Sequence, residues 1–305
     1  MCNLHAIRHW ASVARAGTTR GLVTNKVTRF KVTRFRSIAP NVKWVHFVRH
    51  AESNWNCSTQ GEHVGAHPGL VDMDSDVSPH RGAMQLSQLQ TRLTRGTRHA
   101  LVPPPTLIIT SPLTRAIRTA IALSGTSGIP VVAEPLLTEW LENSCDVGRP
   151  GAVLHREFGD GSAGACAVMG GYPDGGTATA AGRGRGTDAA TVSGLAALGD
   201  GWWPRLPTAA GNEQVSTLAA LARGDRELES SVDARCAAML DALHDPERHP
   251  APSVAIVAHC MILQKLQIKL MERQMGGIIL AVDYLGNTEH RSYCIQTATA
   301  APRRY

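Results

Sequence analysis

Five ionisable side chains with the chemistry of phosphate transfer follow short apolar runs in this sequence. Arg49 and His50 come directly after the run VHFV, and His259 comes directly after VAIVA. Arg115 lies a few residues after TLIIT, and Glu139 follows the segment IPVVAEPLL. If these runs are strands, the five side chains lie just beyond strand ends, and we treat them as candidates for one site.

The residue types define the chemistry of such a site. Guanidinium groups bind phosphate bidentately and keep their charge, so two arginines neutralise a phosphate dianion. Nearby positive charge lowers the pKa of a histidine and keeps its imidazole neutral and nucleophilic. A second, protonated histidine would stabilise the transferring phosphoryl group, and a glutamate of raised pKa would protonate the leaving alkoxide. The set predicts phosphoryl transfer without a metal or another cofactor.

The surrounding elements predict how these residues meet. Apolar runs predict strands at 43–48, 105–110, 129–134, 252–259, 276–285 and 290–298. Helical spacing predicts helices at 82–96, 111–125, 227–244 and 260–272. Alternating strands and helices indicate an α/β fold, a three-layer sandwich with a mostly parallel central sheet. In such sheets ligands bind beyond the carboxyl ends of the strands, where the candidate residues lie.

Local signals support the predicted helix at 111–125. Ser111 is expected to cap this helix, with Pro112 in its first turn and Gly125 at its end.

The Arg-His pair also occurs at 8–9 and 98–99, but neither copy follows a predicted strand. We therefore interpret those two copies as solvated surface residues.

The composition excludes several classes of protein. The formal net charge is +6, but residues 1–40 hold eight Lys and Arg and no Asp or Glu, so the remainder is slightly acidic. A nucleic-acid groove needs basic residues on the folded body, and none are grouped there. No apolar run is long enough to span a membrane. The seven cysteines include no C-x-x-C pair, which favours free thiols in a reducing compartment over a zinc site.

The chain divides into an extension and a body. Residues 1–40 are basic and acid-free, which predicts a disordered or transit-like extension. A cytoplasmic location is the first expectation, and a mitochondrial or plastid location is the alternative. Residues 41–300 are expected to form a single domain with a Gly/Ala-rich insertion at about 159–201. The oligomeric state is left open.

Four segments, in one order, resemble a known family. FVRHAESNWN resembles the R-H-[GA]-x-[ST]-x-x-N signature of the histidine phosphatase superfamily, in its phosphoglycerate-mutase-like branch. SPLTRAIRTA is similar to its second arginine segment, LLTEW to its acid segment, and VAIVAH to the strand that ends in its second histidine. LTEWLENSCDVG and LGNTEHRSY further resemble a fungal, plant and protist subgroup of this branch.

The resemblance implies a role for each matching residue. His50 would be the phosphohistidine nucleophile, and Glu139 the proton donor. The phosphate would be bound by Arg49, Arg115, His259 and Asn56, with His259 also stabilising the transition state. The implied activity is metal-independent hydrolysis of a small phosphorylated substrate.

Two departures from the family pattern leave alternatives open. Cys260 stands where a glycine usually follows the second histidine, so a weakly active or inactive phosphate-binding protein is one alternative. A phosphomutase of the phosphoglycerate mutase type is the other. The arginine and tyrosine of the mutase segment L-N-E-R-x-Y-G are absent from LTEWLENSCDVGRP, which favours a phosphatase.

Overall fold

The computed structural model describes five stretches of the chain: 42–59, 72–94, 101–159, 191–275 and 282–297. The predicted basic extension lies outside them, as does most of the Gly/Ala-rich insertion. Those two interpretations therefore stay predictions.

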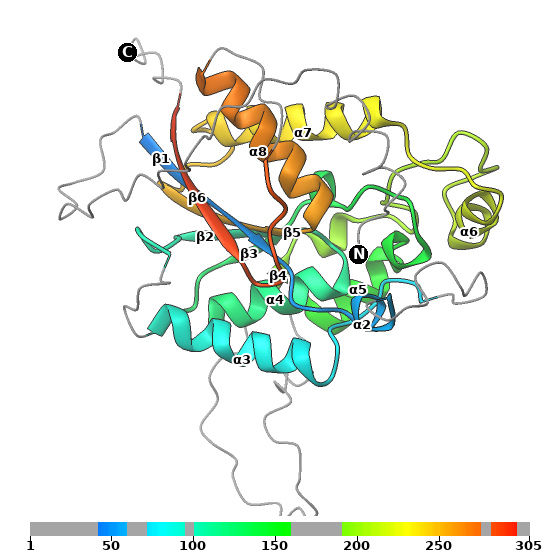
Figure 1. Ribbon diagram of the computed structural model, residues 1–305, viewed down its shortest axis with the longest axis horizontal. Coiled ribbons are helices and arrows are strands. Elements are labelled where there is room, and N and C mark those ends of the chain that lie inside the picture. Colours follow the sequence, from blue (N-terminus) through cyan, green and yellow to red (C-terminus); the bar gives the residue numbers. More distant parts are fainter. Residues whose placement is uncertain (1–41, 60–71, 95–100, 160–190, 276–281, 298–305) are drawn as a thin grey trace, which may run out of the picture.

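A six-stranded sheet forms the centre of the fold, with the order β4-β3-β2-β5-β1-β6. The strands are β1 Val42–Arg49, β2 Leu107–Thr110, β3 Val131–Ala133, β4 Val192–Ser193, β5 Ser253–Ala258 and β6 His290–Gln296. Strands β1 to β5 pair in parallel, and β6 pairs antiparallel with β1. The carboxyl ends of β1, β2, β3 and β5 therefore lie along one edge of the sheet (Figure 1).

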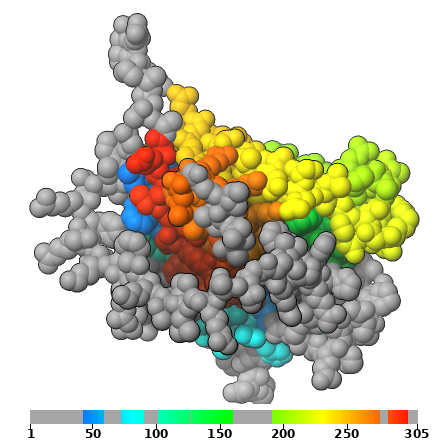
Figure 2. All heavy atoms as spheres, turned by 45° about the horizontal axis from the view of Figure 1, so that its top comes forward, coloured from blue at the N-terminus to red at the C-terminus, as the bar shows by residue number. Residues whose placement is uncertain are grey.

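Helices cover both faces of this sheet (Figure 1). One face carries α3 Arg81–Thr94, α4 Thr114–Ser124 and α5 Gly151–Phe158, and the other carries α7 Glu229–His244 and α8 Cys260–Met275. Figure 2 shows α7 and α8 side by side on the outside of the molecule. The remaining helical segments lie in connections: α2 Asn54–Thr59, α6 Gln214–Ala222, η1 Gly125–Ser127, η2 Pro135–Leu137, η3 Ser144–Asp146 and η4 Leu195–Ala197.

Successive side chains of a strand point to opposite faces of the sheet, so the fold has one hydrophobic core on each face. In β5, Val254 and Ile256 pack into the cluster that contains α7 and α8, whereas Ala255 and Val257 pack into the cluster that contains α4 and α5. All six residues of β5 are buried, as expected for a central strand covered on both faces. The predicted three-layer sandwich is thus confirmed.

Three local predictions differ from the structure. Within the predicted strand 276–285, the described residues 282–285 form no strand. Instead, the carbonyl of Leu285 accepts a hydrogen bond from Arg49, and β1 is already paired on both sides, by β5 and β6. Residues 192–193, placed by composition in the insertion, pair with β3 as the edge strand β4.

The third difference concerns the start of α4. The helix begins at Thr114, and Ser111 does not cap it. The carboxylate of Asp74, from a distant part of the chain, accepts the Thr114 N–H at 2.7 Å instead. Because Asp74 satisfies this terminus, the hydroxyl of Ser111 is available for another contact.

Candidate active site

The register of β1 and β5 brings the two histidines together. Arg49 is paired with Ala258 in the ladder, so His50 and His259 directly follow the ends of two neighbouring parallel strands. The backbone N–H of His50 donates to the Ala258 carbonyl at 2.9 Å. As a result, the centroids of the two imidazole rings lie 4.9 Å apart.

His50 has the tautomer of a nucleophile. Its Nδ1 lies 2.6 Å from the carbonyl oxygen of Ala51, which can only accept, so Nδ1 carries the proton and Nε2 carries the lone pair. The side chain is buried, and this burial, with the charges of Arg115 and Arg49, holds its pKa well below 6.5. His50 is therefore neutral near pH 7.

Both predicted arginines flank His50. Arg49 donates through Nη1 to the Leu285 carbonyl at 2.9 Å, and its buried Nε has no partner among the described residues. Arg115 is buried on α4 and donates to the carbonyl of Cys145 at 2.6 Å and to Oδ1 of Asp146 at 2.9 Å. Each guanidinium has more N–H donors than these contacts use, so both can also bind an anion.

His259 has a ring nitrogen with no hydrogen-bond partner among the described residues. Its Nε2 lies 2.8 Å from the hydroxyl oxygen of Ser111. Its Nδ1 is buried and has no hydrogen-bond partner within the described stretches. Burial, followed by the charge of Arg115 and by His50, lowers the pKa of His259 well below 6.5. Burial beside two arginines thus favours the neutral ring of His259, in contrast to the expectation of a protonated second histidine.

Glu139 lies at the amino-terminal end of α8. Its carboxylate accepts the backbone N–H groups of Trp140, Met261 and Ile262 at 2.9, 3.2 and 3.1 Å, two of which belong to the first turn of α8. Burial raises the pKa of Glu139 well above 4.5, the Cys260 thiol and Asp146 raise it further, and the N–H donors oppose the shift. A buried carboxyl of raised pKa is suited to donate a proton.

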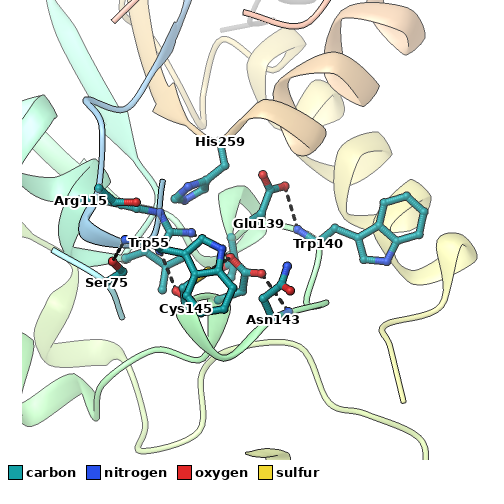
Figure 3. Close-up of polar contacts among 12 residues, drawn as sticks. Trp55, Ser75, Arg115, Glu139, Trp140, Asn143, Cys145 and His259 are labelled. Atoms are coloured by element: carbon teal, nitrogen blue, oxygen red, sulfur yellow. Dashed lines mark hydrogen bonds and ion pairs between the residues drawn. The ribbon is translucent and has the colours of Figure 1, made fainter. Parts of the chain in front are cut away.

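The neighbouring acids differ from Glu139. Glu134 accepts the Leu136 N–H and so caps η2, and Glu142 is only partly buried. Figure 3 shows Glu139, His259 and Arg115 pointing toward one another, while the ring of Trp140 points away. The indole N–H of Trp140 donates to the Glu227 carbonyl at 2.8 Å, which anchors the segment carrying Glu139.

Asn56 is placed in the turn that begins α2. Its Oδ1 accepts the Ser53 N–H at 3.2 Å, and its own N–H donates to the Ser53 hydroxyl at 3.2 Å. These are contacts of a turn residue. Its predicted contact with phosphate stays a prediction.

Cys260 does not disturb the backbone next to His259. Among the described residues other than glycine, only Asp74 and Thr288 have a positive φ. Position 260 therefore does not require glycine. The Cys260 thiol is buried and lies 3.5 Å from Oε2 of Glu139. The substitution changes the surroundings of the proton donor rather than the path of the chain.

Four residues near the site were not assigned by sequence reasoning. They are Ser111, Cys145, Asp146 and Asn287, whose side-chain amide donates to the His50 carbonyl at 2.9 Å. Cys145 and Asp146 belong to the segment SCDVG, and Asn287 belongs to LGNTEHRSY. Both segments resemble the fungal, plant and protist subgroup, but their pattern alone assigns none of these residues to the site.

Two kinds of feature are absent from the described residues. No group of three or more His, Cys, Asp or Glu side chains there is arranged to hold a metal ion. Within the same stretches, no helix combines the length and the apolar character that crossing a membrane requires.

Comparison with known proteins gives one family. Residues 45–160, somewhat over a third of the chain, match the family model of the histidine phosphatase superfamily (branch 1). This stretch contains the matched segments of Arg49, His50, Arg115 and Glu139. No curated protein matches the sequence.

Several solved structures are similar at low identity. Mycobacterial hydrolase 1 is 18% identical, with a TM-score of 0.43 and coverage of 85% of this chain and 100% of that one. A mycobacterial glucosyl-3-phosphoglycerate phosphatase complexed with VO3 is 18% identical, with a TM-score of 0.42 and coverage of 82% and 92%. A phosphoglycerate mutase from Bacillus anthracis is 13% identical, with a TM-score of 0.44 and coverage of 86% and 91%.

Identities this low do not transfer the substrate of any of these proteins to this chain. The similarity to the family is carried by residues 45–160 and by the ordered segments within them. Over residues 45–160, the chain is similar to the histidine phosphatase superfamily (branch 1), whose family model matches this stretch.

Proposed function

We propose that this protein is a metal-independent phosphoric monoester hydrolase that works through a phosphohistidine at His50 on a small phosphorylated substrate. The observation that carries the proposal is the state of His50, a buried neutral imidazole between Arg49 and Arg115. Its Nδ1 is fixed on the Ala51 carbonyl, so the lone pair of Nε2 is available for attack.

In the first step, the phosphate group binds to Arg49, Arg115 and His259. The lone pair of His50 Nε2 then attacks phosphorus, so a P–N bond forms while the ester P–O bond breaks. The leaving alkoxide takes a proton from Glu139, whose raised pKa keeps that proton in place beforehand. The arginines and His259 stabilise the charge on the phosphoryl oxygens.

In the second step, water replaces the alcohol. Glu139, now ionised, takes a proton from a water molecule that attacks phosphorus. The P–N bond breaks, its electron pair returns to His50 Nε2, and inorganic phosphate leaves. The enzyme regains its starting protonation, so the cycle needs no metal or other co-reactant.

We further infer that the protein belongs to the phosphoglycerate-mutase-like branch, in the fungal, plant and protist subgroup. Support comes from the two segments that carry the subgroup resemblance, since both contact proposed catalytic groups. Asp146 pairs with Arg115, and Asn287 binds the carbonyl of His50. A segment that supports the catalytic residues is expected to keep its pattern within a subgroup.

A panel of phosphomonoesters at pH 5–8 tests the proposed function. Folded wild-type protein is expected to release inorganic phosphate from at least one class of substrate. Labelled phosphate separates hydrolysis from the mutase alternative, because a mutase returns the label to a sugar or glycerate hydroxyl. Folded protein that binds inorganic phosphate but turns over no member of the panel would support the binding-protein alternative.

A further inference from the structure

Ser111 lies beside the second histidine, and the mechanism above gives it no role. It follows the last residue of β2, is fully buried, and places its Oγ 2.8 Å from Nε2 of His259. A hydroxyl can donate one hydrogen and accept two, so the direction of this hydrogen bond is not set by distance alone.

The second contact of the Ser111 hydroxyl determines that direction. The backbone N–H of Leu113 donates to Oγ at 3.3 Å and therefore uses a lone pair of the oxygen. Buried hydroxyl hydrogens require an acceptor. A backbone N–H cannot accept, whereas Nε2 of a neutral His259 can. The serine therefore donates to Nε2.

This direction fixes the tautomer of His259. When Nε2 accepts, the proton of the neutral ring is on Nδ1, the buried nitrogen for which the described residues offer no partner. His50 has the opposite arrangement, with Nδ1–H held by Ala51 and the lone pair on Nε2. Two imidazoles 4.9 Å apart thus present one lone pair and one N–H.

The difference matters for a phosphoryl group between the rings. A lone pair on Nδ1 of His259 would repel the phosphoryl oxygens, whereas an N–H donates to them. We propose that Ser111 is a positioning residue that fixes His259 as the Nδ1–H tautomer, so that this N–H binds a phosphoryl oxygen. The use of that N–H in catalysis rests on the proposed function, but the tautomer can be measured without any turnover.

The test combines ring ¹⁵N NMR with kinetics on the full chain. The His259 resonances are assigned by their loss in His259→Gln. Ser111→Ala removes the donor, and Ser111→Thr keeps a hydroxyl. Ser124→Ala is the matched control, because Ser124 is also buried and donates its hydroxyl to the Ile129 carbonyl at 2.7 Å, at the far end of α4. Inorganic phosphate is the ligand used as probe.

In the wild type, we expect the Nδ1–H tautomer and a downfield shift of that N–H when inorganic phosphate is added. Ser111→Ala should lose the tautomer preference and reduce kcat/KM about 10- to 100-fold, as for other outer partners that fix a histidine tautomer. Ser111→Thr should restore both, and Ser124→Ala should change neither.

Three results would overturn the inference. The first is a wild-type His259 protonated on Nε2. The second is a Ser111→Ala protein with an unchanged His259 tautomer. The third is a fall in kcat/KM that is equal in Ser111→Ala and Ser124→Ala. Failure of the proposed function is distinct from all three, because it would appear as absent turnover in a wild type whose His259 still has the Nδ1–H tautomer.

Discussion

Two buried histidines, His46 on strand β1 and His50 directly after its last residue, have opposite surroundings. Both ring nitrogens of His46 are bonded: Nδ1 to the Ser292 hydroxyl at 2.7 Å, and Nε2 to the Pro103 carbonyl at 2.9 Å and the Ser253 hydroxyl at 3.2 Å. His50 has Nδ1 bonded and keeps the lone pair of Nε2, with its ring 4.9 Å from that of His259 and within the influence of the Arg115 charge. Because both ring nitrogens of His46 are hydrogen-bonded, His46 has a structural role. Because only one ring nitrogen of His50 is hydrogen-bonded, the other can react.

Two arginines, Arg115 (buried) and Arg149 (half-buried), repeat this contrast. All three nitrogens of Arg149 are bonded, Nε to Asp74 at 2.9 Å, Nη1 to Glu157 at 2.7 Å and Nη2 to the Thr114 hydroxyl at 2.6 Å. Arg115 bonds a carbonyl and one carboxylate oxygen and retains donors for an anion. Burial alone therefore does not identify the site. The residues of the site are those whose side chains keep hydrogen-bonding groups without a protein partner.

The largest expected effect is the loss of the nucleophile. His50→Ala should reduce kcat/KM for phosphomonoesters by at least about 10⁴-fold, because the covalent route is removed. His46→Gln, on the strand that ends just before His50, is the matched variant and should retain kcat/KM within a few-fold. Steady-state kinetics on both folded proteins checks the pair. Equal losses in the two variants would remove the distinction between the histidines.

Replacement of the proton donor should have the next largest effect. Glu139→Gln should lower kcat about 10²–10³-fold for an alkyl phosphate, and much less for p-nitrophenyl phosphate, whose leaving group needs no proton. Glu134→Gln, which alters a cap of η2, serves as the control.

The same variant gives a test in pH. Because the pKa of Glu139 is raised, wild-type kcat/KM should fall as pH rises through that value, and Glu139→Gln should lose this basic limb. The acid limb should lie below pH 6.5, because the pKa of His50 is lowered. A basic limb that persists unchanged in Glu139→Gln would assign the donor to another group.

A smaller effect is expected from the two arginines. Arg115→Lys should weaken the binding of inorganic phosphate about 10- to 100-fold, since a bidentate charged contact is replaced by a point charge. Arg149→Lys should lower the unfolding temperature while leaving phosphate affinity close to wild type. Isothermal titration and thermal unfolding measure the two quantities. Equal losses of phosphate affinity in the two variants would show that the number of bonded guanidinium nitrogens does not distinguish the role of Arg115 from that of Arg149.

His46 should affect stability rather than turnover. Burial lowers its pKa to about 4 from 6.5, so the folded state favours the neutral ring. Its contribution to stability is therefore complete above pH 6.5 and is lost as pH falls toward 4, a change of about 3 kcal/mol in the free energy of unfolding. Urea titrations from pH 4 to 7 should show a shallower pH dependence in His46→Gln than in the wild type or in His80→Gln, which alters an exposed histidine.

Sequence reasoning predicted most of the elements that build the sheet edge. Strong apolar runs located β1, β2, β3 and β5, because these strands have few exposed positions. The more polar strand β6 was expected from its place at the close of the alternating pattern. The two-residue strand β4 was missed, since Val192-Ser193 has no periodicity of its own and is held by pairing with β3. The predicted strand ending at 285 was wrong over 282–285, because hydrophobicity does not encode whether a sheet edge is available.

Sequence patterns predicted those site residues that come directly after a strand. His50 and His259 meet because their strands are neighbours in register, which the order of elements suggested. The cap of α4 by Asp74, the pairing of Arg115 with Asp146 and the contact of Ser111 with His259 depend on segments distant in sequence. No local pattern carries such information, because it arises from how the loops pack against one another.

The central claim is that His50 Nε2 forms a bond to phosphorus, and trapping of the phosphoenzyme tests it most directly. Wild-type protein is mixed with a phosphomonoester, quenched in alkali to preserve phosphohistidine, digested and analysed by mass spectrometry. We expect one acid-labile phosphoryl group on the peptide that contains His50, absent from His50→Ala and present in His46→Gln. Turnover of substrate with no phosphoryl group on that peptide, or with the group on another residue, would contradict it.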